Sequence, residues 1–512
     1  MSGRVYILPF LFAAAPILTL FANNAGQAHL SETLLPLAAA LVLTALLLPL
    51  LALLVRGTRR AAVALSLLWF LFFSYGHFSQ LIGGLSVAAT SLANPRLLLP
   101  VVAIVWLVCA ALIRRAAAPP HNLAAILLVM VLAMMGTSGF SVAKFYATRE
   151  APPAGALLPE EPIVARRTDR MPDIYYIIFD RYASARTLAD RYGFDNTPMV
   201  DHLRSQGFYV AEDSRANYLV TAQSLASSLN MAHVNVLTES IGTESKDWLP
   251  VFGLLSDHRV GRFLKSHGYR YLHIGPEWNA TAKNPFADRN FEYRFLPEFS
   301  MMFLKTTAAY PILYRFGIGR VDLEKFRRIN YQMEVLEELP RREGRPFFAF
   351  AHFLVPHGPF VFNRDGTFRG PDIAGAHSEL ENYLEQLIFV NDHIRSLVDR
   401  ILAAYPADDQ PVIVIQGDEG PYPARTQPHS FDWRQATNEE INEKMRILNA
   451  IYAPGCEGFH PAQTPVNTFR ILFNCIFDTR LPLLPERSYS YRDLQHLYEF
   501  TDVTDRINAA SH

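Results

Sequence analysis

The pattern of apolar positions changes once along the chain, near residue 150. Before this point, long apolar runs alternate with short polar connections. Five runs approach the roughly 20 apolar residues that a helix needs to cross a bilayer. They cover residues 6–21, 34–55, 61–82, 97–113 and 123–142. We therefore predict a transmembrane domain of five helices over residues 1–145.

Basic residues in the connections predict the orientation of these helices. Arg56, Arg59 and Arg60 follow the second run, and Arg114 and Arg115 follow the fourth. Since basic loops stay on the cytoplasmic side, five spans place the N-terminus inside and the chain after residue 144 outside. The first run is also compatible with a signal peptide, which leaves residue 30 on the outer side in the same way.

Beyond this anchor, the hydrophobic pattern is that of an α/β domain. Residues 146–170 are rich in Pro, Ala and Glu and predict an extended linker. Over 171–512, continuous apolar runs alternate with helix-like stretches, which predicts a mostly parallel sheet with helices on both faces. The expected strands are 174–179, 207–210, 269–274, 346–354, 411–416 and 447–452, and the expected helices include 184–192, 198–206, 260–267 and 379–405.

Composition changes this picture in two respects only. The formal net charge of -1 gives no reason to expect a nucleic acid as partner. Of the three cysteines, Cys109 lies in an apolar run of the anchor. Cys456 and Cys475 either pair, if their domain faces an oxidising compartment, or stay separate with Cys475 buried in FRILFNCIF. Of these two alternatives we expect separate thiols.

Acidic residues follow two of the expected strands. IYYIIFD ends on Asp180, and PVIVIQGDEG leads to Asp418 and Glu419. Because ligands bind at the carboxyl ends of parallel strands, we expect these carboxylates to face one crevice. A lone acid at a strand end is more often a turn or cap residue. The joint placement of the three favours a shared metal site.

A threonine at a helix start is the candidate nucleophile. Thr221 precedes AQSLASSLNM, which predicts a short helix, so its hydroxyl lies near free backbone N–H groups. It is either a nucleophile that takes a phosphoryl or sulfuryl group beside a metal or a plain N-cap. Ser224, Ser227 and Ser228 compete with it for the first role.

Two histidines lie close together in FFAFAHFLVPHGPF. His357 stands between two prolines just past a strand, where a loop can turn its imidazole towards the crevice. It is a candidate for holding a phosphate oxygen or protonating a leaving group. His352 falls inside the apolar run and is expected to be a satisfied core histidine.

Four segments in this order resemble the alkaline phosphatase superfamily, and within it the sulfatase-like hydrolases and transferases. They are PDIYYIIFDRYAS, NYLVTAQSLASSLNM, FLVPHGPF and VIVIQGDEGPYP. The likeness covers residues 171–480, and with the anchor it is similar to the lipoteichoic acid synthase-like and phosphoethanolamine transferase-like membrane enzymes. It implies that a metal-bound threonine takes a substituted phosphoryl group from a lipid donor and passes it to an acceptor or to water.

The resemblance implies a role for each candidate residue. Asp180, Thr221 and Asp418 would bind a divalent metal, Thr221 would also be the nucleophile, and His357 would hold the phosphate or leaving group. The family has Asp-His-Gly where this chain has Asp-Glu-Gly. Glu419 is then expected as a further metal ligand, and its hard oxygen donor shifts the preference from Zn²⁺ towards Mn²⁺ or Mg²⁺.

The same resemblance implies a function and a location. The expected protein is a membrane-anchored phosphoglycerol- or phosphoethanolamine-type transferase that modifies an envelope glycan or lipid. Two alternatives stay open: a phosphatase- or sulfatase-type hydrolase on the same site, and a catalytically inactive envelope scaffold, which the change from histidine to Glu419 favours. The expected location is a bacterial inner or plasma membrane with 171–512 in the periplasm, and acceptor specificity is expected in 276–333.

Overall fold

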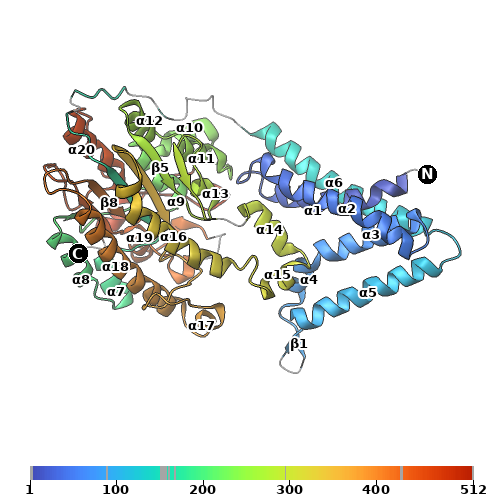
Figure 1. Ribbon diagram of the computed structural model, residues 1–512. Helices are drawn as coiled ribbons and strands as arrows, with labels where there is room; N and C mark the ends of the chain where they lie inside the picture. Colours follow the sequence, from blue (N-terminus) through green and yellow to red (C-terminus); the bar gives the residue numbers. More distant parts are fainter. Residues whose placement is uncertain are drawn as a thin grey trace. The chain divides into compact units, whose positions relative to one another are not determined.

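The chain folds as two compact units, shown in the ribbon diagram of Figure 1. The computed structural model describes residues 4–87, 90–149, 158, 162–166, 169–293, 296–426 and 431–509. One unit comprises Met1–Arg149 and Phe295–Arg320, and the other comprises Glu150–Arg294 and Val321–His512. The sequence assigned residues 171–512 to a single domain. The structure corrects this boundary, because Phe295–Arg320 packs with the N-terminal helices.

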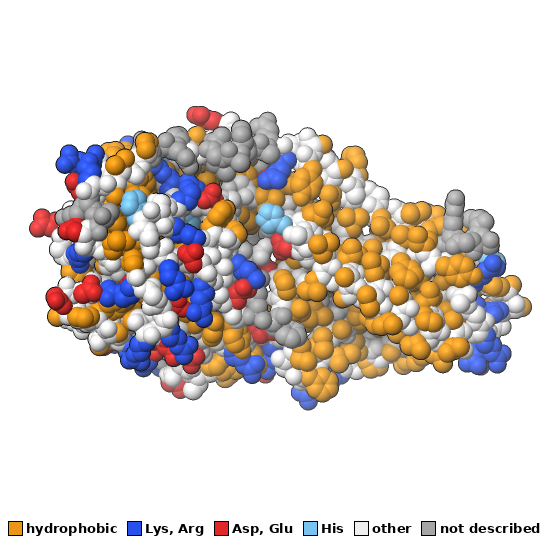
Figure 2. Space-filling model, turned by 45° about the horizontal axis from the view of Figure 1, so that its top comes forward, with side chains coloured by type: hydrophobic (Ala, Val, Ile, Leu, Met, Phe, Trp, Pro, Cys, Tyr) orange, Lys and Arg blue, Asp and Glu red, His pale blue; other side chains and the backbone are white. Residues whose placement is uncertain are grey.

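The N-terminal unit is built from apolar helices. Four are long and apolar enough to cross a membrane, and α3 with α4, bent by 47°, makes a fifth if the pair is one span. Figure 2 shows hydrophobic side chains gathered over these helices. The elements of this unit are η1 (Arg4–Ile7), α1 (Leu8–Asn23), η2 (Leu30–Thr33), α2 (Leu34–Leu54), α3 (Thr58–Phe73), α4 (Tyr75–Ile82), β1 (Ser86–Val87), β2 (Thr90–Ser91), α5 (Pro95–Arg115), α6 (His121–Thr148), α14 (Glu298–Thr306) and α15 (Tyr310–Arg315).

The two basic connections of this unit lie at the same end. The Arg60 guanidinium donates a hydrogen bond to the carbonyl oxygen of Ala116, with an N–O distance of 2.8 Å. Helix α3 begins at this end and α5 returns to it, so the end of α4 and the start of α5 lie at the opposite end. This arrangement agrees with the orientation predicted from the basic loops.

Helices α14 and α15 pack directly on α3 and α4. The amide of Ala308 donates to the carbonyl oxygen of Phe72 over 2.9 Å. A Cβ atom at Gly76 would lie 2.9 Å from the Cα atom of Thr306, so only glycine permits this approach of α4 to α14. These backbone contacts explain why a segment from the middle of the chain joins the N-terminal unit.

The C-terminal unit is built on a seven-stranded sheet, in which β9 alone runs antiparallel to the other described strands. The predicted mostly parallel sheet is therefore confirmed, and β6 is a strand that the sequence pattern did not predict. The strand order is β4-β9-β8-β3-β7-β5-β6. The strands are β3 (Ile174–Phe179), β4 (Tyr209–Val210), β5 (Arg270–Ile274), β6 (Arg289–Phe291), β7 (Phe347–Phe353), β8 (Val412–Gln416) and β9 (Asn449–Tyr452), with a separate pair β10 (Tyr489–Ser490) and β11 (Thr501–Asp502).

Helices cover both faces of this sheet. Every residue of β3, β7 and β8 is buried, as continuous apolar runs require. One face packs against α7 (Ala185–Tyr192), α8 (Thr197–Ser205), α16 (Val321–Arg342) and α18 (Glu379–Ala403). The other packs against α9 (Thr221–Asn230), α11 (Leu249–Ser256), α12 (Arg259–Ser266) and α20 (Pro465–Phe477). The shorter helices are η3 (Val234–Val236), α10 (Leu237–Ile241), α13 (Asn279–Ala282), α17 (Pro371–Gly375), η4 (Ala424–Thr426), η5 (Trp433–Gln435), α19 (Asn438–Met445) and α21 (Thr504–Ala509).

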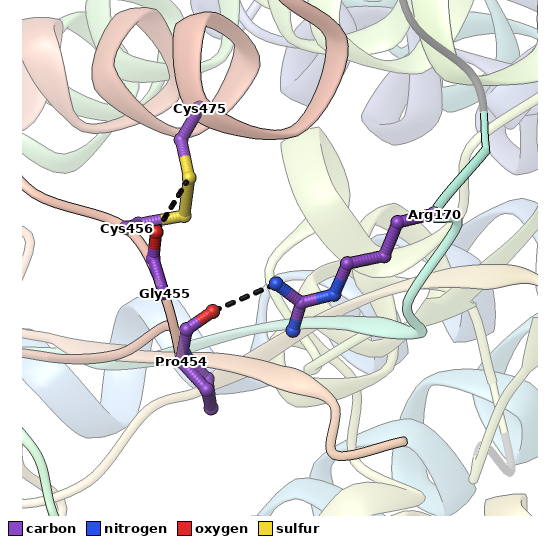
Figure 3. The surroundings of a disulfide bond; sticks show 5 residues. All are labelled: Arg170, Pro454, Gly455, Cys456 and Cys475. Carbon is purple, nitrogen blue, oxygen red and sulfur yellow. Dashed lines mark hydrogen bonds between the residues drawn. A yellow bond between two sulfur atoms is a disulfide. The ribbon is translucent and has the colours of Figure 1, made fainter. Parts of the chain in front are cut away.

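Cys456 and Cys475 form a disulfide, with their Cα atoms 5.5 Å apart (Figure 3). The expectation of separate thiols was wrong. FRILFNCIF is part of helix α20, and Cys475 is only half-buried there, so it faces the loop that follows β9. Arg170 donates to the carbonyl oxygen of Pro454 in the same loop, over 2.7 Å. Residues 150–157, 159–161, 167 and 168 of the predicted linker lie outside the described residues.

Candidate metal and nucleophile site

Three neighbouring strands at the centre of the sheet position the candidate metal ligands. The register of the sheet places Ile178 of β3 beside His352 of β7 and Gln416 of β8. Asp180 and Asp418 follow two residues beyond Ile178 and Gln416. Since side chains alternate along a strand, this spacing turns both carboxylates to the face of the sheet on which His352 lies. The structure thus brings Asp180 and Asp418 together, as the sequence predicted.

Asp180, His352 and Asp418 form a compact group of potential metal ligands. One ligand atom from each lies within 4.8 Å of the others, and all three side chains are buried. Among the described residues, Asp180 Oδ1, Asp418 Oδ2 and His352 Nε2 have no hydrogen-bond partner. Burial, and then the nearby acids, raise the pKa of Asp180 well above its usual value, and burial and Glu419 raise that of Asp418 to about 7. A divalent cation would satisfy these atoms and offset the repulsion.

His352 is the ligand candidate that the sequence argument left out. Its Nδ1 is hydrogen-bonded to the hydroxyl of Thr281 over 2.9 Å, so Nε2 is the ring nitrogen left for a ligand. Burial, followed by the neighbouring His273, lowers the pKa of His352 to about 3, which keeps the imidazole neutral. The expectation of a satisfied core histidine is therefore corrected. The available signal was its position near the carboxyl end of the strand paired with IYYIIFD.

Thr221 is the first residue of α9 and lies half-buried beside this group. Its hydroxyl lies close enough to the carboxyl group of Asp418 to lower the pKa of that group. Ser224, Ser227 and Ser228 are fully buried, and their hydroxyls donate to backbone carbonyl oxygens. Of the four candidate hydroxyls, the one on Thr221 is the best placed to act as a nucleophile.

Glu419 lies in a buried ion pair and outside this group of three. Its Oε1 is 2.6 Å from the Lys444 ammonium and 3.6 Å from Nε of Arg181. Lys444 is itself fully buried, donates to the carbonyl oxygen of Gly420 over 3.0 Å, and lies 3.5 Å from the ring centre of Tyr422. The structure therefore gives Oε1 of Glu419 a cationic partner, whereas its Oε2 is buried without a hydrogen-bond partner among the described residues, so Glu419 stays a predicted ligand beside the group of three.

Arg181 and His357 line a pocket of about 160 Å³ at the edge of the site. The Arg181 amide donates to Oδ1 of Asp418 over 3.2 Å, and the His357 amide donates to the carbonyl oxygen of Asp180 over 3.2 Å. Lys325 holds the loop that carries His357, because its ammonium donates a hydrogen bond to the His357 carbonyl oxygen over 2.6 Å. Burial, followed by Arg181 and Lys325, lowers the pKa of His357 well below its usual value. A guanidinium and a neutral imidazole thus line this pocket together with Glu379 and Glu443, so its anion-binding groups are confined to the side of Arg181 and His357.

The family model described as Sulfatase matches residues 172–445, which is more than half of the 512 residues. The chain belongs to the sulfatase family. The resemblance to the sulfatase-like branch of the alkaline phosphatase superfamily is thereby confirmed. The matched segment of this sulfatase family member contains Asp180, Thr221, His352, Asp418 and Lys444, so the whole candidate site lies inside it.

Solved structures similar to this sulfatase family member include a periplasmic domain and an integral membrane protein. The C-terminal periplasmic domain of EcEptC from Escherichia coli is 14% identical, with 70% of this chain and 99% of that chain covered and a TM-score of 0.45. The complex of the same domain with Zn is 13% identical, with 68% of this chain and 96% of that chain covered and a TM-score of 0.44. The integral membrane protein lipooligosaccharide phosphoethanolamine transferase A (EptA) from Neisseria meningitidis is 11% identical, with 93% and 95% covered and a TM-score of 0.41. No curated protein sequence matches the chain.

Proposed function

We propose that the protein is a membrane-anchored, metal-dependent phospho-group transferase that uses Thr221 as its nucleophile. The observation that carries this proposal is the position of Thr221 at the start of α9, where its hydroxyl lowers the pKa of Asp418, a member of the buried group of ligand atoms. A hydroxyl held at a helix start and beside a metal ligand is in the right place to be ionised and to accept a phosphoryl group. Membership of the sulfatase family supports this reading.

The donor set fits a single divalent ion. Asp180, His352 and Asp418 would hold it, with the Thr221 hydroxyl beside them. When bound, such an ion lowers the pKa of an adjacent hydroxyl and stabilises negative charge on a phosphoryl oxygen. The imidazole nitrogen of His352 suits Zn²⁺ or Mn²⁺ better than Mg²⁺, which prefers oxygen ligands. Glu419, whose Oε1 pairs with Lys444, still offers its unpartnered Oε2 as a hard oxygen donor, which would favour Mn²⁺ over Zn²⁺.

Two transfers at phosphorus follow from this geometry. In the first, the Thr221 oxygen bonds to the phosphorus of a lipid donor while the bond to the leaving oxygen breaks, and that oxygen takes up the threonine proton. In the second, the oxygen of an acceptor hydroxyl bonds to the phosphorus while the bond between phosphorus and the Thr221 oxygen breaks, and the proton of the acceptor hydroxyl passes through His357 to the Thr221 oxygen. His357 Nδ1 lies against the carbonyl oxygen of Gly358, which leaves Nε2 to accept the proton of that hydroxyl. Arg181, in the adjoining pocket, would hold the phosphoryl oxygens.

The proposed location is a bacterial inner or plasma membrane, with residues 171–512 in the periplasm. The long apolar helices support an integral membrane anchor. Support for the orientation comes from the basic connections, which share one end of the N-terminal unit. A phosphoglycerol- or phosphoethanolamine-type transferase with this orientation takes its phospho-group from a membrane lipid and transfers it to an envelope glycan or lipid. In this proposal the transmembrane domain covers residues 1–145, the linker covers 146–170 and the extracytoplasmic domain covers 171–512. The segment Phe295–Arg320 is the exception, because it packs in the N-terminal unit.

The test is to trap the intermediate. Purified full-length protein, loaded with Zn²⁺ or Mn²⁺, is incubated with phosphatidylglycerol or phosphatidylethanolamine and analysed by intact-protein and peptide mass spectrometry. We expect a phosphoglycerol or phosphoethanolamine adduct on Thr221, which Thr221→Ala abolishes and the exposed control Thr243→Ala retains. Turnover by Thr221→Ala equal to that of the wild type removes the mechanism. Turnover that is the same with and without a glycan acceptor identifies a hydrolase, and a metal-loaded protein with neither adduct nor turnover is an inactive scaffold.

A further inference from the structure

A cavity in the N-terminal unit is lined by residues of α4, α5, α14 and α15; Figure 1 shows the course of these helices. Its volume is about 960 Å³, and its lining is mainly apolar. It lies at the end of α4 and the start of α5, opposite the basic connections joined by Arg60 and Ala116. By the positive-inside rule this end is the outer one, so the cavity opens at the outer surface of the membrane.

The charged groups that line this cavity are cations. Arg96, Lys305 and Arg315 belong to its lining, and no acidic residue lines it among the residues that the structure describes. The buried hydroxyl of Tyr75, whose residue is 4% exposed, has no hydrogen-bond partner among the described residues. The 21-residue helix α5 also begins at the cavity wall, with Asn94 as its N-cap, and adds its positive dipole end. Together these groups select an anion.

The apolar part of the lining suits acyl chains. Ile312 and Phe316 are 49% and 76% exposed, and Leu99 lies on the same wall. Tyr310 and Tyr314, with ring centres 5.9 Å apart, add the aromatic side chains that are typical of the membrane–water interface. A cavity lined by apolar side chains and by three cationic residues matches a lipid with a charged head better than it matches a free inorganic ion.

The cavity is a fixed feature of the fold, since its two walls are joined through their backbones. Gly76 allows α4 to approach Thr306, and the Ala308 amide bonds to the carbonyl oxygen of Phe72. The segment that supplies one wall interrupts the sequence of the C-terminal unit between 294 and 321. Acceptor specificity was expected in residues 276–333, and part of that region, Phe295–Arg320, packs in the N-terminal unit instead.

We propose that this cavity binds the phosphate-bearing head of an anionic phospholipid from the outer leaflet of the surrounding membrane. The phosphodiester would lie among Arg96, Lys305 and Arg315, and the acyl chains against Ile312 and Phe316. A zwitterionic head is disfavoured because the described part of the lining offers no carboxylate for its ammonium group. This lipid site is separate from the proposed donor chemistry at Thr221 and does not depend on it.

Native mass spectrometry of the full-length protein in a neutral detergent tests the proposal. The protein is titrated separately with dioleoyl phosphatidylglycerol, dioleoyl phosphatidylcholine and inorganic phosphate. We expect one phosphatidylglycerol to bind at least about fivefold more tightly than phosphatidylcholine, from the contribution of a basic residue near a lipid head. Arg96→Gln and Lys305→Gln should each weaken phosphatidylglycerol binding by about fivefold.

The matched control is Arg114→Gln, which removes the same charge from the far end of α5. If Arg114→Gln weakens phosphatidylglycerol binding as much as Arg96→Gln and Lys305→Gln do, the proposed site is wrong, because binding would then depend only on the overall charge of the protein. Equal binding of phosphatidylcholine overturns the selection for an anion. Inorganic phosphate that binds alone and displaces the lipid overturns the lipid as ligand. Tyr75→Phe, which removes one hydroxyl only, should weaken binding if the wild-type site exists and leave it unchanged if it does not.

Discussion

Replacing Lys444 by methionine tests the buried ion pair that sets this site apart from its family pattern. Lys444 is fully buried, Glu419 is 3% exposed, and their charged atoms lie 2.6 Å apart. Removing one partner of such a pair leaves a buried charge uncompensated and costs about 3–5 kcal/mol. Because Arg181 stays 3.6 Å from Glu419 as a second cation, we expect a loss near the lower end, about 3 kcal/mol.

Removing both charges should restore most of this loss. In Lys444→Met with Glu419→Gln the buried pair is removed as a whole, which is often close to neutral. Arg181 loses Glu419 as a partner in this variant but keeps Asp180 and Asp418 as nearby acids. We expect the double variant to lie within about 1 kcal/mol of the wild type. The single variant should lower the melting temperature of the C-terminal unit by about 5–10 °C. Lys246→Met, which removes an exposed lysine, is the control.

The assay is thermal unfolding of the full-length protein in detergent, followed by intrinsic fluorescence and combined with metal analysis. The double variant should retain bound metal, because Asp180, His352 and Asp418 remain. A double variant as unstable as Lys444→Met would refute the pairing argument. Loss of the metal in the double variant would instead make Glu419 a ligand.

Three further predictions concern other parts of the fold. His352→Ala should lower divalent-ion affinity by more than about 100-fold, since losing even an outer partner of a ligand costs about 10–100-fold; isothermal titration calorimetry measures it. Replacing Cys456 and Cys475 by serine opens a loop of 19 residues and should cost about 3 kcal/mol of unfolding free energy in denaturant titration. Gly420→Ala should lower both turnover and melting temperature, because its Cβ would lie 2.3 Å from a backbone carbonyl oxygen, whereas Gly375→Ala has open space and should be neutral.

Each of these has a contradicting outcome. Unchanged metal affinity in His352→Ala would show that His352 is a structural core residue and does not bind the metal. An equal loss in the exposed control His377→Ala would show the same. A reductant should destabilise the wild type and leave the double serine variant unaffected; an equal effect on both would argue against the disulfide. Wild-type turnover by Gly420→Ala would show that the backbone after Asp418 tolerates displacement.

Much of the fold was predictable because it depends on local runs of side chains. An apolar run long enough for a bilayer is a property of neighbouring residues, and so is the continuous burial of 174–179 and 411–416 in a parallel sheet. These runs coincide with the helices of the N-terminal unit and with β3 and β8. The joint placement of Asp180 and Asp418 followed from one general rule about the ends of parallel strands.

The sequence by itself determined the membrane anchor, the α/β domain and the two aspartates of the site. The tertiary structure alone decided what those aspartates meet: His352 through the register of β3 with β7, and Glu419 through its pairing with Lys444 on α19. It also decided the attachment of Phe295–Arg320 and the disulfide. Each of these depends on the packing of segments far apart in the chain, whereas the predictable features depend on hydrophobic patterns within single segments.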